Sequence, residues 1–373
     1  MNKKIIFSSG GTGGHILPAI HLMNHFSEKG YEVLLVTDYR GKKFINDISK
    51  FRSYEITTGT PTNKNIFKKI FSFFLIFLSI FRSVKIIKKE KPDLIFGTGG
   101  YVSFPISIIS KFFGIPLVIY ESNTMIGRAN KFLLSSSRKI FIAHEICMKL
   151  PQKYKNKTHI VGVVLDKKII NYEHKKTISD KKHFSILILG GSQAAEIFGK
   201  VIPPVINMLK EKNFNIEVMQ QSIKSQKDEI KNFYEKNNIK NYVFEFDEDV
   251  FNLMTSSNLA ITRCGATATA ELAQTKTPFI AVPLPNSVDN HQYWNAKYYE
   301  SRFCCWILEQ KETFVPRRSF NEKNLYDLIL DIIEKKNRLE TKRDQEFIKH
   351  ISNKNVYQNI EDQIKRTIHF YEN

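Results

Sequence analysis

The sequence is short of cysteine, tryptophan and acidic residues. Of its 373 residues, 4 are cysteine and 2 are tryptophan, and 37 acidic residues stand against 56 lysines and arginines. No two cysteines form a C-x-x-C pair, so neither a disulfide framework nor a metal site is predicted. This usage fits a protein of a reducing compartment.

The chain also lacks a long apolar run. Its longest apolar stretch, residues 70–81, is shorter than the roughly 20 residues that cross a bilayer, and residues 5–7 are too few for a signal peptide. Basic side chains flank the stretch at Lys68, Lys69, Arg82, Lys85, Lys88 and Lys89. The pattern predicts a helix that lies on an anionic membrane surface, with a helix buried inside a domain as the alternative.

The net charge of +19 requires an explanation. Such a surplus attracts anionic lipid, phosphorylated substrates or nucleic acid, although biased base composition of the gene is an alternative source of lysine. No nucleic-acid-binding motif accompanies the charge, and much of it gathers beside the apolar stretch. The sequence therefore predicts no nucleic-acid partner.

Two halves of the chain open in the same way, with a strand, a glycine turn and a helix. In the first half, strands are expected at residues 4–8, 32–37, 93–96, 117–120 and 139–142, with a helix at 16–29. After the polar segment 162–183 come a strand at 184–189, a helix at 194–210, and strands at 216–219, 242–246, 259–262 and 279–282. This alternation predicts an α/β protein with two Rossmann-like parallel-sheet domains that face a central cleft.

The glycine turns at residues 10–14 and 190–191 are candidates for phosphate binding. Glycine lets backbone N–H groups approach a phosphate, and the positive end of the following helix points to the same place. The first turn matches neither the dinucleotide fingerprint nor the P-loop, because Ile16 stands at the third glycine position and no Gly-Lys-Ser/Thr follows. This mismatch argues against an NAD-dependent enzyme and against an ATPase.

Two further stretches in the second half have the composition of a ligand site. Small residues follow Arg263 through residues 264–270, and Glu271 then supplies a carboxylate that can accept hydrogen bonds from two ribose hydroxyls. Polar and aromatic residues gather at 289–296, where sugar recognition and a capped helix start are both possible readings.

Six motifs, spread in order over almost the whole chain, resemble those of the MurG family of glycosyltransferases. They are GGTGGH at 10–15, GTGGYVS at 97–103, ESN at 121–123, GGSQ at 190–193, CGATATAE at 264–271 and HQYWNA at 291–296. The resemblance implies a GT-B fold and inverting transfer of N-acetylglucosamine from UDP-N-acetylglucosamine to undecaprenyl-pyrophosphate-linked lipid I, which gives lipid II for peptidoglycan. It implies no cofactor and a peripheral location on the cytoplasmic face of the inner membrane.

The resemblance also divides the chain and assigns site residues. It implies an acceptor- and membrane-binding domain at 1–162, a UDP-sugar-binding domain at 163–340, and a C-terminal helix at 341–373 that returns to the first domain. His15 is the expected catalytic base, with Glu121 as the weaker alternative. The expected substrate contacts are Thr12, Gly13, Gly14, Asn123, Ser192, Gln193, Arg263, Ala266, Thr267, Ala268, Thr269, Ala270, Glu271 and Gln292.

One departure from the family pattern alters a charge. Where the family reads V-G-N-P-V-R, this chain has VGVVLD at 161–166, so Asp166 replaces the arginine of a substrate contact and Lys167 follows it. A carboxylate would repel a diphosphate, so Lys167 or the loop backbone is expected to compensate.

Three other functions are compatible with parts of this reading. They are transfer to a different lipid acceptor such as diacylglycerol, epimerisation of a UDP-sugar on the same two-domain fold, and nucleic-acid binding. Product analysis separates the first two from lipid I glycosylation, and a filter-binding assay at physiological salt tests the third.

Overall fold

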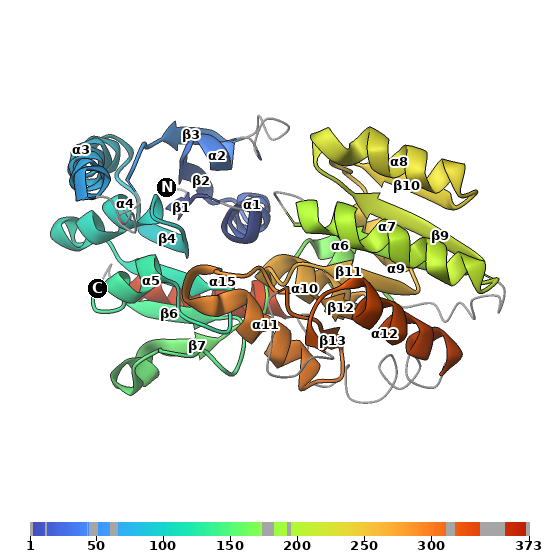
Figure 1. The fold of residues 1–373 in the computed structure, drawn as a ribbon. Helices are drawn as coiled ribbons and strands as arrows, with labels where there is room; N and C mark the ends of the chain where they lie inside the picture. The colour runs from blue at the N-terminus through green and yellow to red at the C-terminus, as the bar shows by residue number, and fades with distance from the viewer. Residues whose placement is uncertain are drawn as a thin grey trace. The chain divides into compact units, whose positions relative to one another are not determined.

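The computed structural model describes residues 3–11, 13–42, 44, 51–59, 66–173, 183–191, 195–310, 318–335 and 355–370. The chain divides into two compact units, which Figure 1 shows in ribbon form. Unit 1 comprises Met1–Lys167 and Asn353–Asn373, and unit 2 comprises Lys168–Ser352. Each unit contains one parallel sheet with helices on its connections, as the alternating pattern predicted.

Unit 1 is built on a seven-stranded sheet with the order β3-β2-β1-β4-β5-β6-β7. Its strands are β1 (Lys4–Ser9), β2 (Glu32–Thr37), β3 (Arg52–Glu55), β4 (Leu94–Gly99), β5 (Leu117–Glu121), β6 (Lys139–Ile142) and β7 (Thr158–Ile160). Its helices are α1 (Gly13–Glu28), α2 (Tyr39–Lys42), α3 (Ile66–Glu90), α4 (Ser103–Ser110), α5 (Arg128–Leu133) and α15 (Val356–Phe370), with short 3-10 turns η1 (Lys111–Phe113) and η2 (Gln152–Lys157). Every residue of β4 and β5 is buried, as expected of central parallel strands.

Unit 2 is built on a six-stranded sheet with the order β10-β9-β8-β11-β12-β13. Its strands are β8 (Phe184–Leu189), β9 (Ile216–Gln221), β10 (Lys240–Phe244), β11 (Leu259–Thr262), β12 (Phe279–Ala281) and β13 (Cys305–Ile307). Its helices are α7 (Glu196–Glu211), α8 (Lys227–Lys236), α9 (Val250–Ser256), α10 (Ala266–Gln274), α11 (His291–Glu300) and α12 (Glu322–Glu334), with η3 (Lys224–Gln226) and η4 (Val288–Asn290); α6 (Lys167–Ile170) joins the two units.

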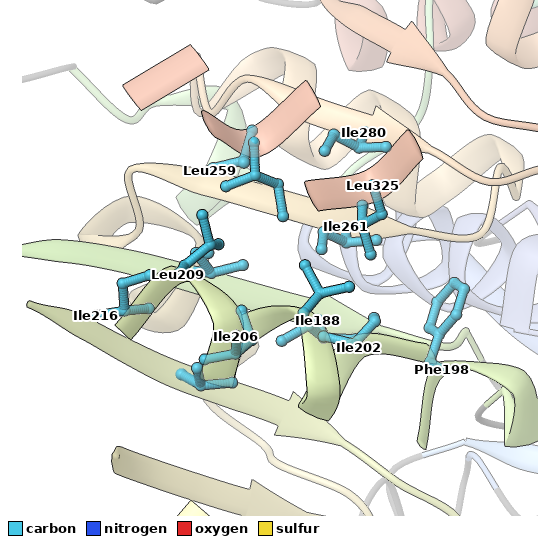
Figure 2. Close-up of a cluster of buried hydrophobic side chains, with 14 of the residues drawn as sticks. Ile188, Phe198, Ile202, Ile206, Leu209, Ile216, Leu259, Ile261, Ile280 and Leu325 are labelled. Atoms are coloured by element: carbon cyan, nitrogen blue, oxygen red, sulfur yellow. The ribbon is translucent and has the colours of Figure 1, made fainter. Parts of the chain in front are cut away.

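The core of unit 2 shows why its helices cover the sheet. Ile202, Ile206 and Leu209 recur at helical spacing along α7 and are fully buried. Figure 2 shows them beside Ile188 of β8 and Ile261 of β11, so one stripe of α7 packs on two central strands. Burial of this apolar surface is the main stabilising term for the unit.

The strand orders place the glycine turns at the switch point of each sheet. In unit 1 the order reverses between β1 and β4, and in unit 2 it reverses between β8 and β11. Ligands of open α/β sheets bind outside the carboxyl ends of strands at this point. The turns that follow β1 and β8 therefore lie where a ligand site is expected.

Helix α3 is longer than the predicted apolar stretch, because the helix continues through the basic residues that follow it. Its segment Ile70–Glu90 is long and apolar enough to cross a membrane, by length and composition only. The length argument that excluded crossing was therefore wrong. Burial, rather than length, argues against a membrane-spanning role for α3. Ser79, Ser83 and Ile87 are buried, and Glu90 accepts hydrogen bonds from Lys4 and Arg52.

The other face of α3 is exposed and apolar. The phenylalanines whose side chains the structure describes all lie on that face, namely Phe71, Phe74, Phe77 and Phe81. Ser79 and Ser83 lie on the buried side of the helix. Small residues let α3 lie close to the domain and leave the large rings outside.

Helix α15 belongs to unit 1, although unit 2 separates it from the rest of that unit in sequence. Ile360 and Ile364 are fully buried, and the hydroxyl of Tyr357 donates to the carbonyl of Leu165 over 2.6 Å. A buried pair joins His25 Nε2 of α1 to Glu361 Oε2 over 2.9 Å. Burial, partly offset by the glutamate, holds the pKa of His25 below its usual value.

Candidate functional site

Two glycine turns of unit 1 pack directly against each other. They follow β1 and β4, which are hydrogen-bonded neighbours with Ser9 paired to Gly99. A Cβ atom on Gly100 would lie 2.7 Å from the carbonyl oxygen of Gly10, and one on Gly10 would lie 2.6 Å from Cγ2 of Val102. Gly100 also has φ +80°, which side chains rarely tolerate. Both glycines are therefore required by the packing of the protein itself.

His15, the expected base, lies against the second of these turns. Its Nδ1 is 3.1 Å from the carbonyl oxygen of Thr98, and a Cβ atom on Gly99 would lie 2.9 Å from the same nitrogen. Because a carbonyl only accepts, Nδ1 carries the hydrogen of the neutral ring and Nε2 carries the lone pair. This tautomer can accept a proton at Nε2.

The amide of Gly11 is not directed at a ligand. Oδ1 of Asp38, the residue that follows β2, accepts from the N–H of Gly11 over 3.2 Å and from that of Gly41 over 2.8 Å. Burial disfavours the Asp38 carboxylate, but these hydrogen bonds and Arg40 together hold its pKa below the usual range.

Sequence reasoning missed Asp38, although a signal for it exists. Asp38 directly follows the predicted strand 32–37, and the carboxyl ends of neighbouring parallel strands meet at one edge. The structure describes two of the three other residues predicted at this turn. Gly13 and Gly14 begin α1, whose first turn contains no acidic residue, whereas Thr12 lies outside the described residues.

Glu121 organises the loop that follows β5. Its Oε1 accepts from the backbone N–H and the side-chain amide of Asn123, and its Oε2 accepts from the N–H of Gly127 and the amide of Asn130. These four donors occupy both oxygens of the buried carboxylate. This geometry favours a role in shaping the loop and presenting Asn123 over the weaker alternative of a catalytic base.

The glycine turn of unit 2 follows β8 and adjoins the end of β11. The N–H of Gly190 donates to Oε1 of Gln221 over 3.1 Å, and Gly191 has φ +79°. A Cβ atom on Gly191 would lie 3.8 Å from Cβ of Arg263. Ser192 and Gln193, both expected contacts, lie outside the described residues.

Arg263 is buried, and its hydrogen bonds link the segments that follow β12 and β13. Its Nη1 donates to the carbonyls of Val282 and Pro283, its Nη2 donates to Oε1 of Gln310 over 2.6 Å, and its guanidinium lies over the ring of Phe198. Burial lowers its pKa from the ordinary value, since desolvation disfavours the charged form. These contacts fix a buried cation beside the glycine turn of unit 2, where it adds positive potential.

Helix α10 begins at an open position. Gly265 is its N-cap, and among the residues that the structure describes no side chain caps the helix and no atom lies within 4 Å of where a Cβ atom of Gly265 would be. Four of the expected contacts have buried side chains, namely Ala266, Thr267, Thr269 and Ala270. The backbone N–H groups of Ala266 and Thr267 lie in the first turn and can face a ligand, whereas the N–H of Thr269 already donates to the carbonyl of Gly265 over 3.1 Å. Ala268 and Glu271 have partly exposed side chains.

Gln292 ties the start of α11 to the start of α10. Its Oε1 accepts from the N–H of Cys264 over 3.1 Å and from that of Leu284 over 2.9 Å. Asp289 and Asn290, directly before α11, both adopt left-handed backbone angles, with φ 53° and 59°. Such residues hold a strained turn that sets the direction of the helix and hence of Gln292.

Asp166 and Lys167 both make contacts inside unit 1. Oδ2 of Asp166 is 4.0 Å from Nδ1 of His21 on α1. Lys167 donates to Glu28 and lies over the ring of Tyr357, 5.7 Å from its centroid. Compensation by Lys167 for the lost arginine therefore requires that it leave Glu28.

Within the ranges that the structure describes, no three His, Cys, Asp or Glu side chains gather in a way that could hold a metal ion. The helix starts and backbone amides at these turns are groups that can bind an anion.

Comparison with known proteins adds a family to this geometry. The model of the glycosyltransferase family 28 N-terminal domain matches residues 5–142, and that of the family's C-terminal domain matches residues 185–361. The chain is 36% identical over 361 residues to a Pelagibacter ubique protein and 33% identical over 357 residues to a Rickettsia bellii protein. These alignments cover 96% and 94% of the chain and 97% and 98% of the relatives.

Both relatives are named UDP-N-acetylglucosamine–N-acetylmuramyl-(pentapeptide) pyrophosphoryl-undecaprenol N-acetylglucosamine transferase. Among solved structures, MurG from Acinetobacter baumannii superposes with a TM-score of 0.74 at 23% identity, covering 98% of this chain and 99% of that one. MnaA from S. aureus, solved with UDP, gives 0.67 at 14% identity and covers 98% and 97%. Both likenesses show the GT-B fold, and the near-full-length identity shows more: the chain belongs to the MurG family within glycosyltransferase family 28, a family of hexosyltransferases.

Proposed function

We propose that the chain transfers N-acetylglucosamine from UDP-N-acetylglucosamine to the N-acetylmuramoyl-pentapeptide of undecaprenyl-pyrophosphate-linked lipid I, with inversion at the anomeric carbon. The observation that carries the proposal is the end-to-end similarity to relatives that are named for this transfer. The geometry supports it because each sheet presents an anion-binding turn at its switch point, and the turns of unit 1 also hold a histidine.

His15 would act as the general base. A hydroxyl of the acceptor sugar attacks the anomeric carbon, the bond from that carbon to UDP breaks, and the hydroxyl proton passes to Nε2. Hydrogen bonding of Nδ1 to the Thr98 carbonyl orients the ring for this step. A positioned base of this kind contributes about 100- to 10,000-fold to rate.

Unit 2 would bind the nucleotide and stabilise the departing diphosphate. Helix α10 contributes the positive end of its dipole and first-turn amides that no side chain caps. Glu271, one and a half turns into the helix, has a partly exposed carboxylate suited to ribose hydroxyls. The motif assigns Asn123, Ser192, Gln193, Arg263 and Gln292 to the same substrate, and the buried contacts of Arg263 and Gln292 give these two a positioning role.

Product analysis tests the reaction. Purified protein with labelled UDP-N-acetylglucosamine and lipid I should form a lipid-linked disaccharide, while diacylglycerol in place of lipid I should remain unlabelled. Incubation of the donor alone should leave the sugar unchanged, since epimerisation would give UDP-N-acetylmannosamine. Labelled diacylglycerol or epimerised donor, with no labelled lipid I product, would overturn the proposal.

The membrane assignment is part of the same proposal, because the lipid-linked acceptor stays in a bilayer. The exposed face of α3 carries Phe71, Phe74, Phe77 and Phe81, and Lys85, Lys88 and Lys89 near its end are exposed. Apolar rings beside lysines suit the surface of an anionic leaflet, where each lysine adds about 1 kcal/mol that salt weakens. The partly buried α3 supports peripheral attachment on the cytoplasmic face.

Vesicle binding tests this assignment. The protein should bind vesicles of anionic lipid more strongly than neutral ones, and high salt should release part of it. Replacing Phe74 and Phe77 with Ser should reduce binding to both kinds of vesicle, and replacing Lys85, Lys88 and Lys89 with Gln should reduce the anionic preference alone. Absence of binding by the wild type would remove the membrane assignment.

A further inference from the structure

An arginine that no motif singles out lies beside the first glycine turn. Helix α2 follows β2 closely and places Arg40 so that its Nη2 is 3.6 Å from where a Cβ atom of Gly11 would be. The tight start of α2 depends on Gly41, because a Cβ atom there would lie 2.0 Å from Oγ1 of Thr37. The chain thus brings a guanidinium over the turn from a neighbouring strand end.

Asp38 holds this guanidinium by one edge. Its Oδ2 accepts from Nε of Arg40 over 3.1 Å and from Nη2 over 2.9 Å, while its Oδ1 accepts from Gly11 and Gly41. One carboxylate therefore fixes the glycine turn and the arginine together. Nη1 of Arg40 has no hydrogen bond to any residue within the described ranges, and about 63% of the side chain is exposed.

The charges around the turn favour an anion. The negative charge of Asp38 is matched by Arg40, and the positive end of α1 adjoins the same turn with no acidic residue in its first turn. A guanidinium held by one edge keeps its other N–H groups in a plane, which suits two oxygens of a phosphate. A surface ion pair with no other role contributes little to stability. Replacing Arg40 therefore distinguishes a substrate contact from a surface ion pair without a function.

We propose that Arg40 is a substrate-binding residue that contacts a phosphate of the diphosphate-bearing substrate at the first glycine turn, and that Asp38 is its positioning residue. The inference deepens the proposed function and rests on it, since both substrates of that reaction carry a diphosphate. The lipid-linked acceptor and the nucleotide-sugar are the two sources of this group, and kinetics distinguishes them.

The kinetic test compares Arg40→Gln with Lys42→Gln. Lys42 lies on the same short helix, pairs with Glu55 over 3.5 Å, and loses the same charge on substitution. Arg40→Gln should raise KM for one substrate about ten- to hundredfold, as expected for a lost charge-assisted hydrogen bond, with kcat within a few-fold. Lys42→Gln should stay within about twofold. A rise in KM for the acceptor alone would assign the Arg40 contact to the acceptor's diphosphate. A rise in KM for the donor alone would assign it to the diphosphate of the nucleotide-sugar.

A binding test is independent of catalysis. Inorganic pyrophosphate, titrated by calorimetry, should bind Arg40→Gln about ten- to hundredfold more weakly than Lys42→Gln, and Arg40→Lys should lie between them because lysine keeps the charge without the fork. Equal Tm values for the three variants exclude unfolding. Unchanged KM values and an unchanged pyrophosphate Kd in Arg40→Gln would overturn the inference. If the wild type transfers no sugar, the proposed function fails, and the titration still decides the role of Arg40.

Discussion

Glycine serves different purposes at the turns of unit 1 and at the start of α10 in unit 2. In unit 1, Gly10 and Gly100 are forced by contacts with Val102 and with the Gly10 carbonyl, at 2.6 and 2.7 Å from the missing Cβ atoms. In unit 2, a Cβ atom on Gly265 would touch no described part of the chain within 4 Å. The two glycines of unit 1 are packed against other parts of the protein, whereas Gly265 borders open space within the part of the chain that the structure describes.

This difference separates two tasks. Closely packed turns hold His15 at a fixed angle, which a proton transfer requires. An open helix start offers its amides to a ligand that arrives and leaves. The comparison therefore predicts that changes at His15 and at the closely packed glycines of unit 1 affect kcat or folding, and that changes at helix α10 of unit 2 affect the KM of the donor.

The largest effect is expected at His15. His15→Gln removes the proton acceptor and should lower kcat about 100- to 10,000-fold, with a much smaller change in the KM of UDP-N-acetylglucosamine. Steady-state kinetics at saturating acceptor measures both constants. A kcat within tenfold of the wild type would assign the base elsewhere and would break the proposed division of tasks.

Gly100→Ala should be the most destabilising substitution of the four. The added methyl group meets the Gly10 carbonyl and the backbone keeps a positive φ, and the two effects together cost about 3 kcal/mol. Chemical denaturation measures the free energy of unfolding. Wild-type stability for this variant would show that the two turns of unit 1 can separate at little cost.

Glu271→Ala tests the nucleotide task in unit 2. Loss of hydrogen bonds from ribose hydroxyls to a carboxylate should raise the KM of the donor about ten- to hundredfold and leave the KM of the acceptor unchanged. Glu271→Gln keeps one acceptor oxygen and should fall between. An unchanged donor KM in a folded variant would remove Glu271 from the site.

The smallest effect is expected at Gly265. Gly265→Ser places a hydroxyl in the open space, where it can cap α10 without strain because the backbone is extended there. Stability should be unchanged or slightly higher, yet the serine oxygen competes with the diphosphate for the same amides. We expect the donor KM to rise about fivefold, the equivalent of about 1 kcal/mol. A loss of stability like that of Gly100→Ala would erase the contrast between the units.

The central strands were predictable from sequence because burial on both faces leaves a continuous apolar run, as in β1 and β8. Strands β3, β7 and β13 were not predicted. They are edge strands of three or four residues. Strand β3 carries mostly exposed side chains, so its sequence has no such run, whereas β13 lies in the apolar run at 303–308 and could have been predicted from it. A partner strand supplies the hydrogen bonds that define them.

Prediction of the site residues has a similar limit, because a sequence shows local motifs but not contacts between distant residues. His15 was found because it belongs to a local motif, and the prediction of its role stands on that motif. Asp38 contacts Gly11 across 27 residues of sequence, and only the pairing of β1 with β2 brings them together. Burial of Thr267 and Thr269 likewise depends on how α10 packs, so the sequence could not separate side-chain contacts from backbone contacts.

The return of α15 to unit 1 sets an order of assembly during synthesis. Unit 2 leaves the ribosome before α15 does, so unit 1 must wait with an uncovered surface where Ile360 and Ile364 will later be buried. Tyr357 and the His25–Glu361 pair complete that surface when they arrive. A nascent chain halted after unit 2 would hold a finished second domain and an incomplete first one, although the first was translated earlier.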